Sequence, residues 1–313
     1  MLDRKPTEFR PSGDILVADR RGTTMPFSKG LMAASIMATG LPPEDAHRLA
    51  RRIAEALVAS ERFVLDADDL IEVAADVLRR ARGPRVADRY LAWRTAKRSA
   101  RPIIVLIGGV SGVGKSALAT KLAARLDLPQ VVPTDAIRQI MRCFMSRDDH
   151  PEIHRSSFSG ARPGDAVGAV RGFADQAETV VRGVTGLIDR FVTEQRDGIV
   201  EGVHVVPGMF SSRRLADIRR EAVLVQVLLV IRDGDTHRAH FHHRSAENSH
   251  GRDPVRYLER LWDIRSIQDD LETRAARHDV PVVVAGHLDT ALQTVISHVV
   301  EAVVADDAMT AAV

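Results

Sequence analysis

Residues 103–116, IIVLIGGVSGVGKS, give the clearest indication of the fold in this sequence. The first five residues of this stretch form a continuous apolar run, which is typical of a strand buried on both faces of a parallel sheet. Gly109 to Ser116 then fits the pattern G-x-x-x-x-G-K-S/T, and an amphipathic helix follows. A strand, a glycine-rich loop and a helix in this order predict a loop whose backbone N–H groups surround phosphate oxygens.

Each residue of this loop has an expected part in binding a nucleoside triphosphate such as ATP. The glycines allow the backbone to curl around the phosphates. We expect Lys115 to reach the β- and γ-phosphates and to act in catalysis, and the Ser116 hydroxyl to bind Mg²⁺. The expected nucleotide-binding residues of the loop are Gly109, Val110, Ser111, Gly112, Val113, Gly114, Lys115 and Ser116.

Further apolar runs alternate with helical patterns along the rest of the chain. Such alternation predicts an α/β domain with a parallel sheet flanked by helices, of the P-loop NTPase type. The predicted strands are 103–107, 131–132, 199–200, 223–231 and 280–285, and the predicted helices are 116–126, 136–146, 165–194, 257–278 and 290–304.

The first part of the chain has a different pattern. Residues 14–19 predict a short strand, and residues 28–82 are mostly helical in their apolar spacing. We therefore expect a small, mainly helical domain over residues 1–85, a basic linker helix over 86–100, and the phosphate-loop domain over 101–313.

Composition narrows the class of protein. The 313 residues are 45% hydrophobic and 27% charged, with a net charge of +2, which favours a globular chain with neither a nucleic-acid nor a membrane partner. The most apolar stretch, 222–231, is half the length of a membrane helix.

Cys143, the single cysteine, excludes an internal disulfide and is expected to be a buried thiol. The start MLDRKPTEFR lacks the apolar core of a signal peptide, so we expect a cytoplasmic protein, and a homo-oligomer stays open.

Charged residues follow two predicted strands, at the edge where parallel sheets bind ligands. Asp135 follows the strand at 131–132, where it can act as a base, help to hold Mg²⁺, or simply cap a helix. Glu201 follows the strand at 199–200 and is expected near the metal or the attacking group, unless it is an ordinary strand-end residue. Gly202 would then allow a ligand to approach the backbone closely.

Donors for an anionic substrate gather after the same strands. Arg138 and Arg142 are four residues apart and share one helical face. Residues 152–158 form a polar segment that either binds an anion or is a solvated loop. The expected substrate-binding residues are Thr134, Asp135, Arg138, Arg142, His154, Arg155, Gly202 and His204.

The segment from Asp235 to Arg252 is rich in arginine and histidine. As a lid, it would bring Arg238 to the nucleotide and Arg244 to the transferring phosphoryl group, whose charge must be neutralised. Two alternatives remain open, namely metal binding by the histidines and a plain basic surface helix.

Several of these segments resemble the 2-phosphoglycerate kinase family. The matching runs are Val132–Arg138 (VPTDAIR), Ile153–Phe158 (IHRSSF), Val200–Pro207 (VEGVHVVP) and Tyr257–Asp269 (YLERLWDIRSIQD), and the similarity covers roughly residues 100–300. The resemblance implies a fold like that of nucleoside monophosphate kinases. It also implies transfer of the ATP γ-phosphoryl group to 2-phosphoglycerate, a small phosphorylated acceptor, to give 2,3-bisphosphoglycerate.

The first domain resembles an ATP-cone, the nucleotide-binding regulatory domain that often precedes such a kinase domain. Val17, Gly22 and Pro26–Lys29 (PFSK) carry this resemblance, while the charges at residues 19–21 (DRR) differ from the usual pattern.

Two other functions fit the same motifs. One is a kinase of another phosphorylated or hydroxy acid, or of a nucleic-acid end, although an aromatic content of 4% argues against a nucleic-acid groove. The other is a regulatory protein that senses nucleotide and catalyses little.

Overall fold

A computed structural model describes residues 15–18, 23–99, 101–158, 162, 164–247 and 254–311, without the side chains of 243–247, 254 and 309–311. The residues 19–22, which enter the resemblance to an ATP-cone, lie outside this description, as does most of the segment 243–253. The chain divides into two compact units between Arg98 and Ser99, and each is described by itself.

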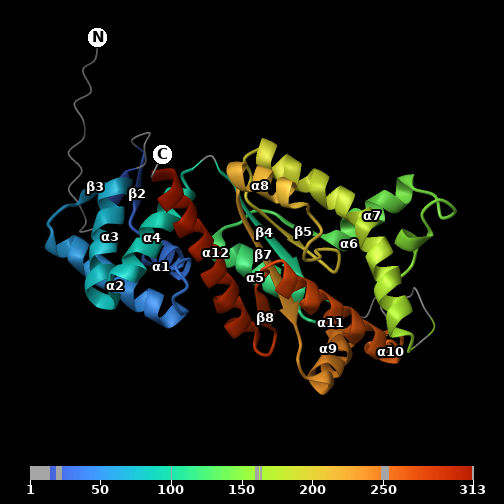
Figure 1. Cartoon of the computed structure of the whole chain (residues 1–313). Helices are drawn as coiled ribbons and strands as arrows, with labels where there is room; N and C mark the ends of the chain where they lie inside the picture. Colours follow the sequence, from blue (N-terminus) through green and yellow to red (C-terminus); the bar gives the residue numbers. More distant parts are fainter. Residues whose placement is uncertain are drawn as a thin grey trace, which may run out of the picture. The chain divides into compact units, whose positions relative to one another are not determined.

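The first unit combines a three-stranded sheet with helices (Figure 1). Strand β1 (Leu16–Ala18) pairs antiparallel with β2 (Thr24–Pro26) and parallel with β3 (Val64–Asp66). The helices are α1 (Lys29–Met37), α2 (Pro43–Ala59), α3 (Ala67–Arg82) and α4 (Pro84–Ala96). The sequence pattern misses β2 and β3, because three residues are too few to show an alternation.

Helix α4 covers most of the segment expected to link two domains. It packs against α3, and its Ala87 and Tyr90 are buried in the core of the first unit. The helix is therefore part of the first unit and not a free connection.

The second unit is built on a parallel five-stranded sheet with the order β5-β6-β4-β7-β8. This order places β4, which leads into the phosphate loop, at the centre, where all six of its residues are buried. The strands are β4 (Ile103–Gly108), β5 (Val131–Pro133), β6 (Gly198–Glu201), β7 (Val223–Val230) and β8 (Val282–Val284).

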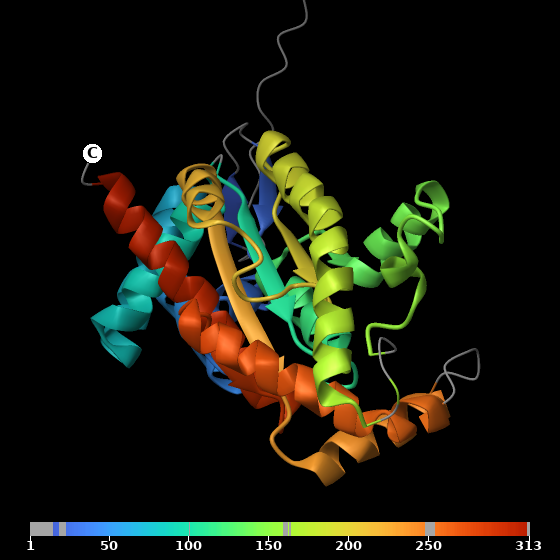
Figure 2. The same cartoon turned by 45° about the vertical axis from the view of Figure 1, so that its right-hand side comes forward.

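Helices cover both faces of this sheet. Ile104, Leu106 and Val200 share one core with residues of α7 and α8. Helix α12 packs on β7 and α5, and Figure 2 shows it on the other side of the strands from α7. The helices are α5 (Lys115–Leu126), α6 (Thr134–Phe144), a 3-10 turn η1 (Pro151–His154), α7 (Ala166–Thr193), α8 (Ser212–Glu221), α9 (Gly234–Glu247), α10 (Pro254–Glu259), α11 (Leu261–Arg277) and α12 (Leu288–Ala311). The α/β fold predicted from the sequence is confirmed.

Three details differ from the expectations. The single helix expected over 257–278 is two, α10 and α11, which meet at Arg260. The thiol of Cys143 is exposed, so the expectation of a buried cysteine was wrong. No stretch long enough for a membrane helix was expected, whereas among the described residues Leu288–Ala308 is long and apolar enough by length and composition. Its Val295, Ile296 and Val299 are fully buried in the unit.

Candidate active site

The phosphate loop connects β4 to α5 at the carboxyl edge of the sheet. Its glycines are required by its shape, because Gly109, Gly112 and Gly114 have φ angles of 141°, 86° and 84°. A side chain at Gly109 would also collide with the carbonyl oxygen of Leu229 on β7. The loop therefore fits closely between its neighbouring strand and the helix it begins.

Two side chains of the loop are held in place by polar partners. The buried Lys115 donates a hydrogen bond from Nζ to the carbonyl oxygen of Val110, 2.8 Å away. The Ser116 hydroxyl donates to Oε1 of Glu201, 2.7 Å away. Glu201 is buried and pairs in register with Ile107 on β4, so the sheet itself brings this carboxylate to the loop.

Asp135 lies in the first turn of α6, but it does not cap the helix. The capping position is Pro133, which offers no side-chain hydrogen bond. Oδ1 of Asp135 accepts a hydrogen bond from Arg138, 3.2 Å away, and the carboxylate is partly exposed to solvent. The carboxylate is thus oriented by an arginine while remaining accessible.

Buried groups near the start of α6 form a chain of hydrogen bonds. The imidazole of His204 lies between Oγ1 of Thr134, at 2.9 Å from Nδ1, and Oε1 of Gln176, at 3.0 Å from Nε2. The Gln176 amide nitrogen donates to the carbonyl oxygens of Glu152 and Arg155. Thr134 and His204 are completely buried, so they position the site from behind and do not line its surface.

The hydrogen bonds of this chain have a single consistent direction. Because the Gln176 nitrogen faces two carbonyl oxygens, its Oε1 must be the acceptor toward His204. His204 therefore carries its proton on Nε2, and its Nδ1 accepts from the Thr134 hydroxyl. Burial lowers the pKa of His204 to about 3, against the opposing attraction of Asp135, so the ring is neutral at ordinary pH.

Gly202 makes room for this chain of hydrogen bonds and not for a ligand. A methyl group at Gly202 would overlap Oγ1 of Thr134. Because Gly202 has no side chain, the ends of strands β5 and β6 can come together with Thr134 between them. The sequence pattern had instead suggested that this glycine lets a ligand approach the backbone.

A cavity of about 440 Å³, here called the arginine cavity, lies beside Asp135 and Arg138. It is lined by Arg138, Arg142, His154, Arg155, Ser156 and Arg256. None of these described lining residues is acidic. The Arg138 guanidinium also donates to the carbonyl oxygens of Ile153 and Arg155, at 3.1 and 3.0 Å, which fixes the segment carrying His154 to α6.

Arg138 and Arg142 also retain hydrogen-bonding capacity. The Nε atom of each is buried and has no hydrogen-bond partner within the described part of the chain. The Nε2–H of His154 is used by the carbonyl oxygen of Met145, 2.9 Å away. The guanidinium groups that line the cavity favour an anionic ligand there.

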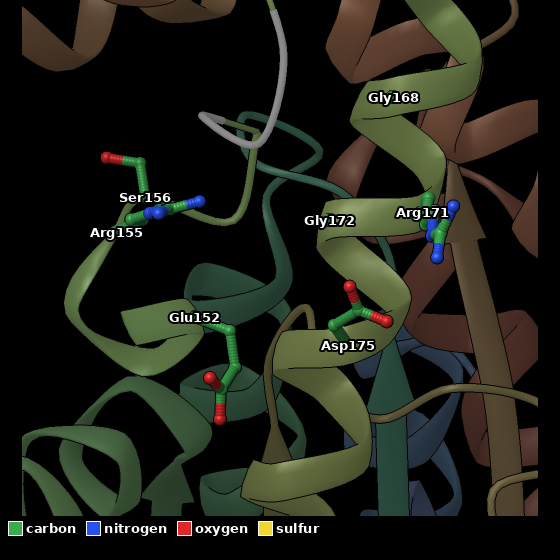
Figure 3. Close-up of a pocket in the computed structure, with 7 residues that line it drawn as sticks. All are labelled: Glu152, Arg155, Ser156, Gly168, Arg171, Gly172 and Asp175. Atoms are coloured by element: carbon green, nitrogen blue, oxygen red, sulfur yellow. The ribbon is translucent and has the colours of Figure 1, made fainter. Parts of the chain in front are cut away.

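A second, smaller cavity of about 250 Å³ shares Arg155 and Ser156 with the first. Figure 3 shows α7, with Arg171 and Asp175 beside two glycines, facing the segment of Glu152 to Ser156 across it. Its described lining residues are Glu152, Arg155, Ser156, Gly168, Arg171, Gly172 and Asp175. Charges of both signs line this cavity, in contrast to the arginine cavity.

Helix α9 holds the residues expected in a lid. His237 and His240 donate to carbonyl oxygens of the phosphate loop, whereas Arg238 is exposed. The side chain of Arg244 lies outside the described residues. The hydrogen bonds from this helix to the loop, within the described part of the chain, therefore come from its histidines.

Sequence reasoning did not single out three residues of this site. Gln176 could have been noticed, since it is a polar residue on the apolar face that α7 shows at Phe173, Ala177 and Val180. Nothing in the sequence distinguishes Arg171 or Arg256 from the many other arginines of the chain, because only the fold brings them to the cavities.

Comparison with known proteins gives a consistent result for both units. Residues 15–99 match the family model of the ATP cone domain, which includes helix α4. The 2-phosphoglycerate kinase of Methanocaldococcus jannaschii is 37% identical over 273 residues, covering 86% of each chain. That of Methanopyrus kandleri is 34% identical over 280 residues, covering 88% of this chain and 84% of its own.

A third relative extends over nearly the whole length. The 2-phosphoglycerate kinase of Pyrococcus furiosus is 30% identical over 292 residues, covering 92% of this chain and 94% of its own. These relatives match the phosphate-loop unit and the unit before it, in the same order. The chain therefore belongs to the 2-phosphoglycerate kinase family.

Proposed function

We propose that this protein is an ATP-dependent kinase that transfers the γ-phosphoryl group to the free hydroxyl of 2-phosphoglycerate, giving 2,3-bisphosphoglycerate and ADP. The observation that carries the proposal is the arginine cavity, which is lined in part by α6. Helix α6 follows β5, and the complete phosphate loop follows β4 of the same parallel sheet. The relatives named above support this choice of acceptor.

The nucleotide would occupy the loop from Gly109 to Ser116. Its backbone N–H groups and the start of α5 offer partial positive charge to the phosphates. Lys115 adds a full charge near the transferring group. Phosphoryl transfer depends mostly on such positioning and charge stabilisation, so this arrangement supplies what the nucleotide side of the reaction needs.

Ser116 and Glu201 fit a magnesium ion as part of this site. Both present oxygen atoms, 2.7 Å apart, which are the ligands that Mg²⁺ prefers. Among the described residues there is no cluster of three or more His, Cys, Asp or Glu side chains that could hold a metal ion. Mg²⁺ held by one or two protein oxygens and the phosphates fits this donor set, and it would neutralise phosphate charge.

The acceptor would bind in the arginine cavity. 2-Phosphoglycerate carries a carboxylate and a phosphate, so it needs several cationic donors in one place. Arg142, Arg155 and Arg256 line the cavity from three different segments, which favours a ligand with two anionic groups over one with a single charge. Arg138 connects this cavity to Asp135.

Asp135 is the proposed base. As the acceptor hydroxyl oxygen forms its bond to the γ-phosphorus, the bond from that phosphorus to the ADP oxygen breaks, and the hydroxyl proton passes to the Asp135 carboxylate. The carboxylate is partly exposed and fixed by Arg138, so it can meet a bound hydroxyl. Glu201 is buried on Ser116 and serves better as a metal partner.

The first unit would then act as a regulatory module. Residues 15–99 match the ATP cone domain, and their core is formed within that unit. We propose that the chain is organised as a regulatory unit up to Arg98 followed by a catalytic unit from Ser99.

Steady-state kinetics with a panel of acceptors test the proposal. With ATP fixed, 2-phosphoglycerate should have a much higher kcat/KM than glycerate or 3-phosphoglycerate. Arg142→Gln and Arg256→Gln should each raise the KM for 2-phosphoglycerate about tenfold or more, from the ~1.5–3 kcal/mol typical of hydrogen bonds to charged groups. Arg147→Gln is the control, because Arg147 is exposed and does not line the cavity.

A higher kcat/KM for an unphosphorylated acid would contradict the choice of acceptor. An unchanged KM in both cavity variants would place the acceptor elsewhere.

A further inference from the structure

We propose that His237 and His240 of α9 are positioning residues for nucleotide binding, which hold the phosphate loop with its N–H groups directed at the phosphates. This inference rests only on the nucleotide side of the proposed function. It requires that ATP bind the loop, and it does not depend on which acceptor is used.

The geometry consists of two hydrogen bonds from one helix to consecutive loop residues. Nε2 of His237 lies 2.8 Å from the carbonyl oxygen of Ser111. Nδ1 of His240 lies 3.0 Å from the carbonyl oxygen of Gly112. A carbonyl oxygen can only accept, so each ring nitrogen must be the donor.

These two bonds fix the direction of the next two N–H groups. In a planar trans peptide, the C=O of one residue and the N–H of the next point to opposite sides. When His237 holds the Ser111 oxygen, the N–H of Gly112 is turned the other way. When His240 holds the Gly112 oxygen, the N–H of Val113 is turned likewise. A loop of this kind binds phosphate with its N–H groups, so both histidines act from its far side.

The loop sequence is adapted to this contact. A methyl group at Gly112 would lie 2.7 Å from Cζ of Phe241 and 2.9 Å from Nε2 of His237. Glycine at this position thus leaves room for α9 to pack against the loop, and it also adopts the φ angle of 86° without strain. The middle glycine of the motif, which the pattern G-x-x-x-x-G-K-S/T leaves unspecified, therefore has a definite role in this chain.

Aromatic packing keeps His237 in place. Its ring stacks on Phe241 with centroids 5.2 Å apart, and Phe241 stacks on Tyr257 of α10 at 5.0 Å. Tyr257 in turn contacts Phe158 at 5.2 Å. His237 is fully buried, and its Nδ1 has no hydrogen-bond partner among the residues that the structure describes. His237 thus packs like an aromatic residue of the core, and its hydrogen bond to Ser111 is what a phenylalanine at this position could not make.

The two histidines use different ring nitrogens, and this provides a specific test. Glutamine can place its amide N–H group where His237 has Nε2–H, and asparagine can place its own where His240 has Nδ1–H. Phenylalanine fills the same space but has no donor. Rescue by the matched amide, together with loss in phenylalanine, separates hydrogen bonding from packing.

The measurement is the Kd for ATP, obtained by titration calorimetry of the full chain. His237→Phe and His240→Phe should each weaken ATP binding about three- to tenfold, the change that corresponds to one net hydrogen bond. His237→Gln and His240→Asn should stay within about twofold of the parent protein. His242→Phe, on the same helix at an exposed position, is the control and should bind ATP as the parent does.

Two results would overturn the inference. One is an unchanged Kd in both phenylalanine variants. The other is equal weakening in the phenylalanine and the amide variants, which would assign the effect to packing. If the parent protein binds ATP as expected but does not phosphorylate 2-phosphoglycerate, the proposed acceptor is wrong and this inference stands.

Discussion

The buried histidine behind the active site predicts a pH dependence of stability. Burial holds the pKa of His204 at about 3, compared with 6.5 for a histidine in water. On acidification the unfolded chain takes up a proton at this residue while the folded chain does not. The contribution of the neutral His204 to the free energy of unfolding is therefore complete above pH 6.5, and it is lost progressively as the pH falls toward 3.

The size of the effect follows from the same two pKa values. Linkage gives a slope that approaches ~1.4 kcal/mol per pH unit between them, or about 2 kcal/mol of unfolding free energy lost between pH 6.5 and pH 4.5. His204→Gln removes this titration while keeping an amide donor for Oε1 of Gln176. The variant is expected to be less stable at pH 7, because the Thr134 hydroxyl loses its acceptor.

Urea unfolding at several pH values, followed by circular dichroism, measures this slope. Between pH 6.5 and 4.5, His204→Gln should lose about 2 kcal/mol less than the parent protein. Groups that titrate elsewhere contribute equally to both proteins and cancel in the difference. His287→Gln, at an exposed position, is the matched control for the substitution. Equal slopes in the parent and His204→Gln would refute the neutral, buried assignment of His204.

Three further substitutions test the site. Lys115→Ala should lower kcat more than about 100-fold with the fold retained, because it removes the charge aimed at the transferring group; activity above a few per cent would remove Lys115 from that role. Glu201→Gln should raise the Mg²⁺ concentration needed for half-maximal rate and lower kcat about 100-fold, and an unchanged Mg²⁺ dependence would argue against a metal partner. Gly202→Ala should destabilise the protein by about 1–3 kcal/mol, measured by urea unfolding, because its methyl group overlaps Thr134; parent-like stability would show that the strand ends can separate freely.

The sequence was sufficient to predict the phosphate loop and the position of Glu201 beside it. The apolar run at 103–107 and the glycines after it predict strand, loop and helix, because each follows from local pattern. The meeting of Ser116 and Glu201 also follows from pattern, since carboxyl ends of parallel strands share one edge.

The parts that could not be predicted depend on contacts between distant segments. Thr134 and His204 are polar residues at strand ends, which favours a surface role. In the folded chain both are buried. Gln176, which is 28 residues from His204 in sequence, bonds to His204 on one side and to the carbonyl oxygen of Arg155 on the other, and the sequence does not indicate this contact. Helix periodicity likewise continues across Arg260, where α10 ends without a glycine or proline to indicate it.

The contacts of α9 show the same limit. The composition of Asp235–Arg252 drew attention to its arginines, because arginines commonly neutralise phosphate charge. In the folded chain the residues that face the loop are His237 and His240, and Arg238 is exposed. Which face of a helix meets its neighbour is set by packing, here by the stack of Phe241 on Tyr257.

Phosphoryl transfer to 2-phosphoglycerate can be observed by ³¹P NMR of the protein with ATP, Mg²⁺ and 2-phosphoglycerate. We expect a second phosphomonoester resonance on the acceptor, appearing in equal amount with ADP, and no such resonance when Lys115→Ala replaces the parent protein. Release of inorganic phosphate without a new phosphomonoester, or no consumption of ATP by the folded protein, would contradict this expectation.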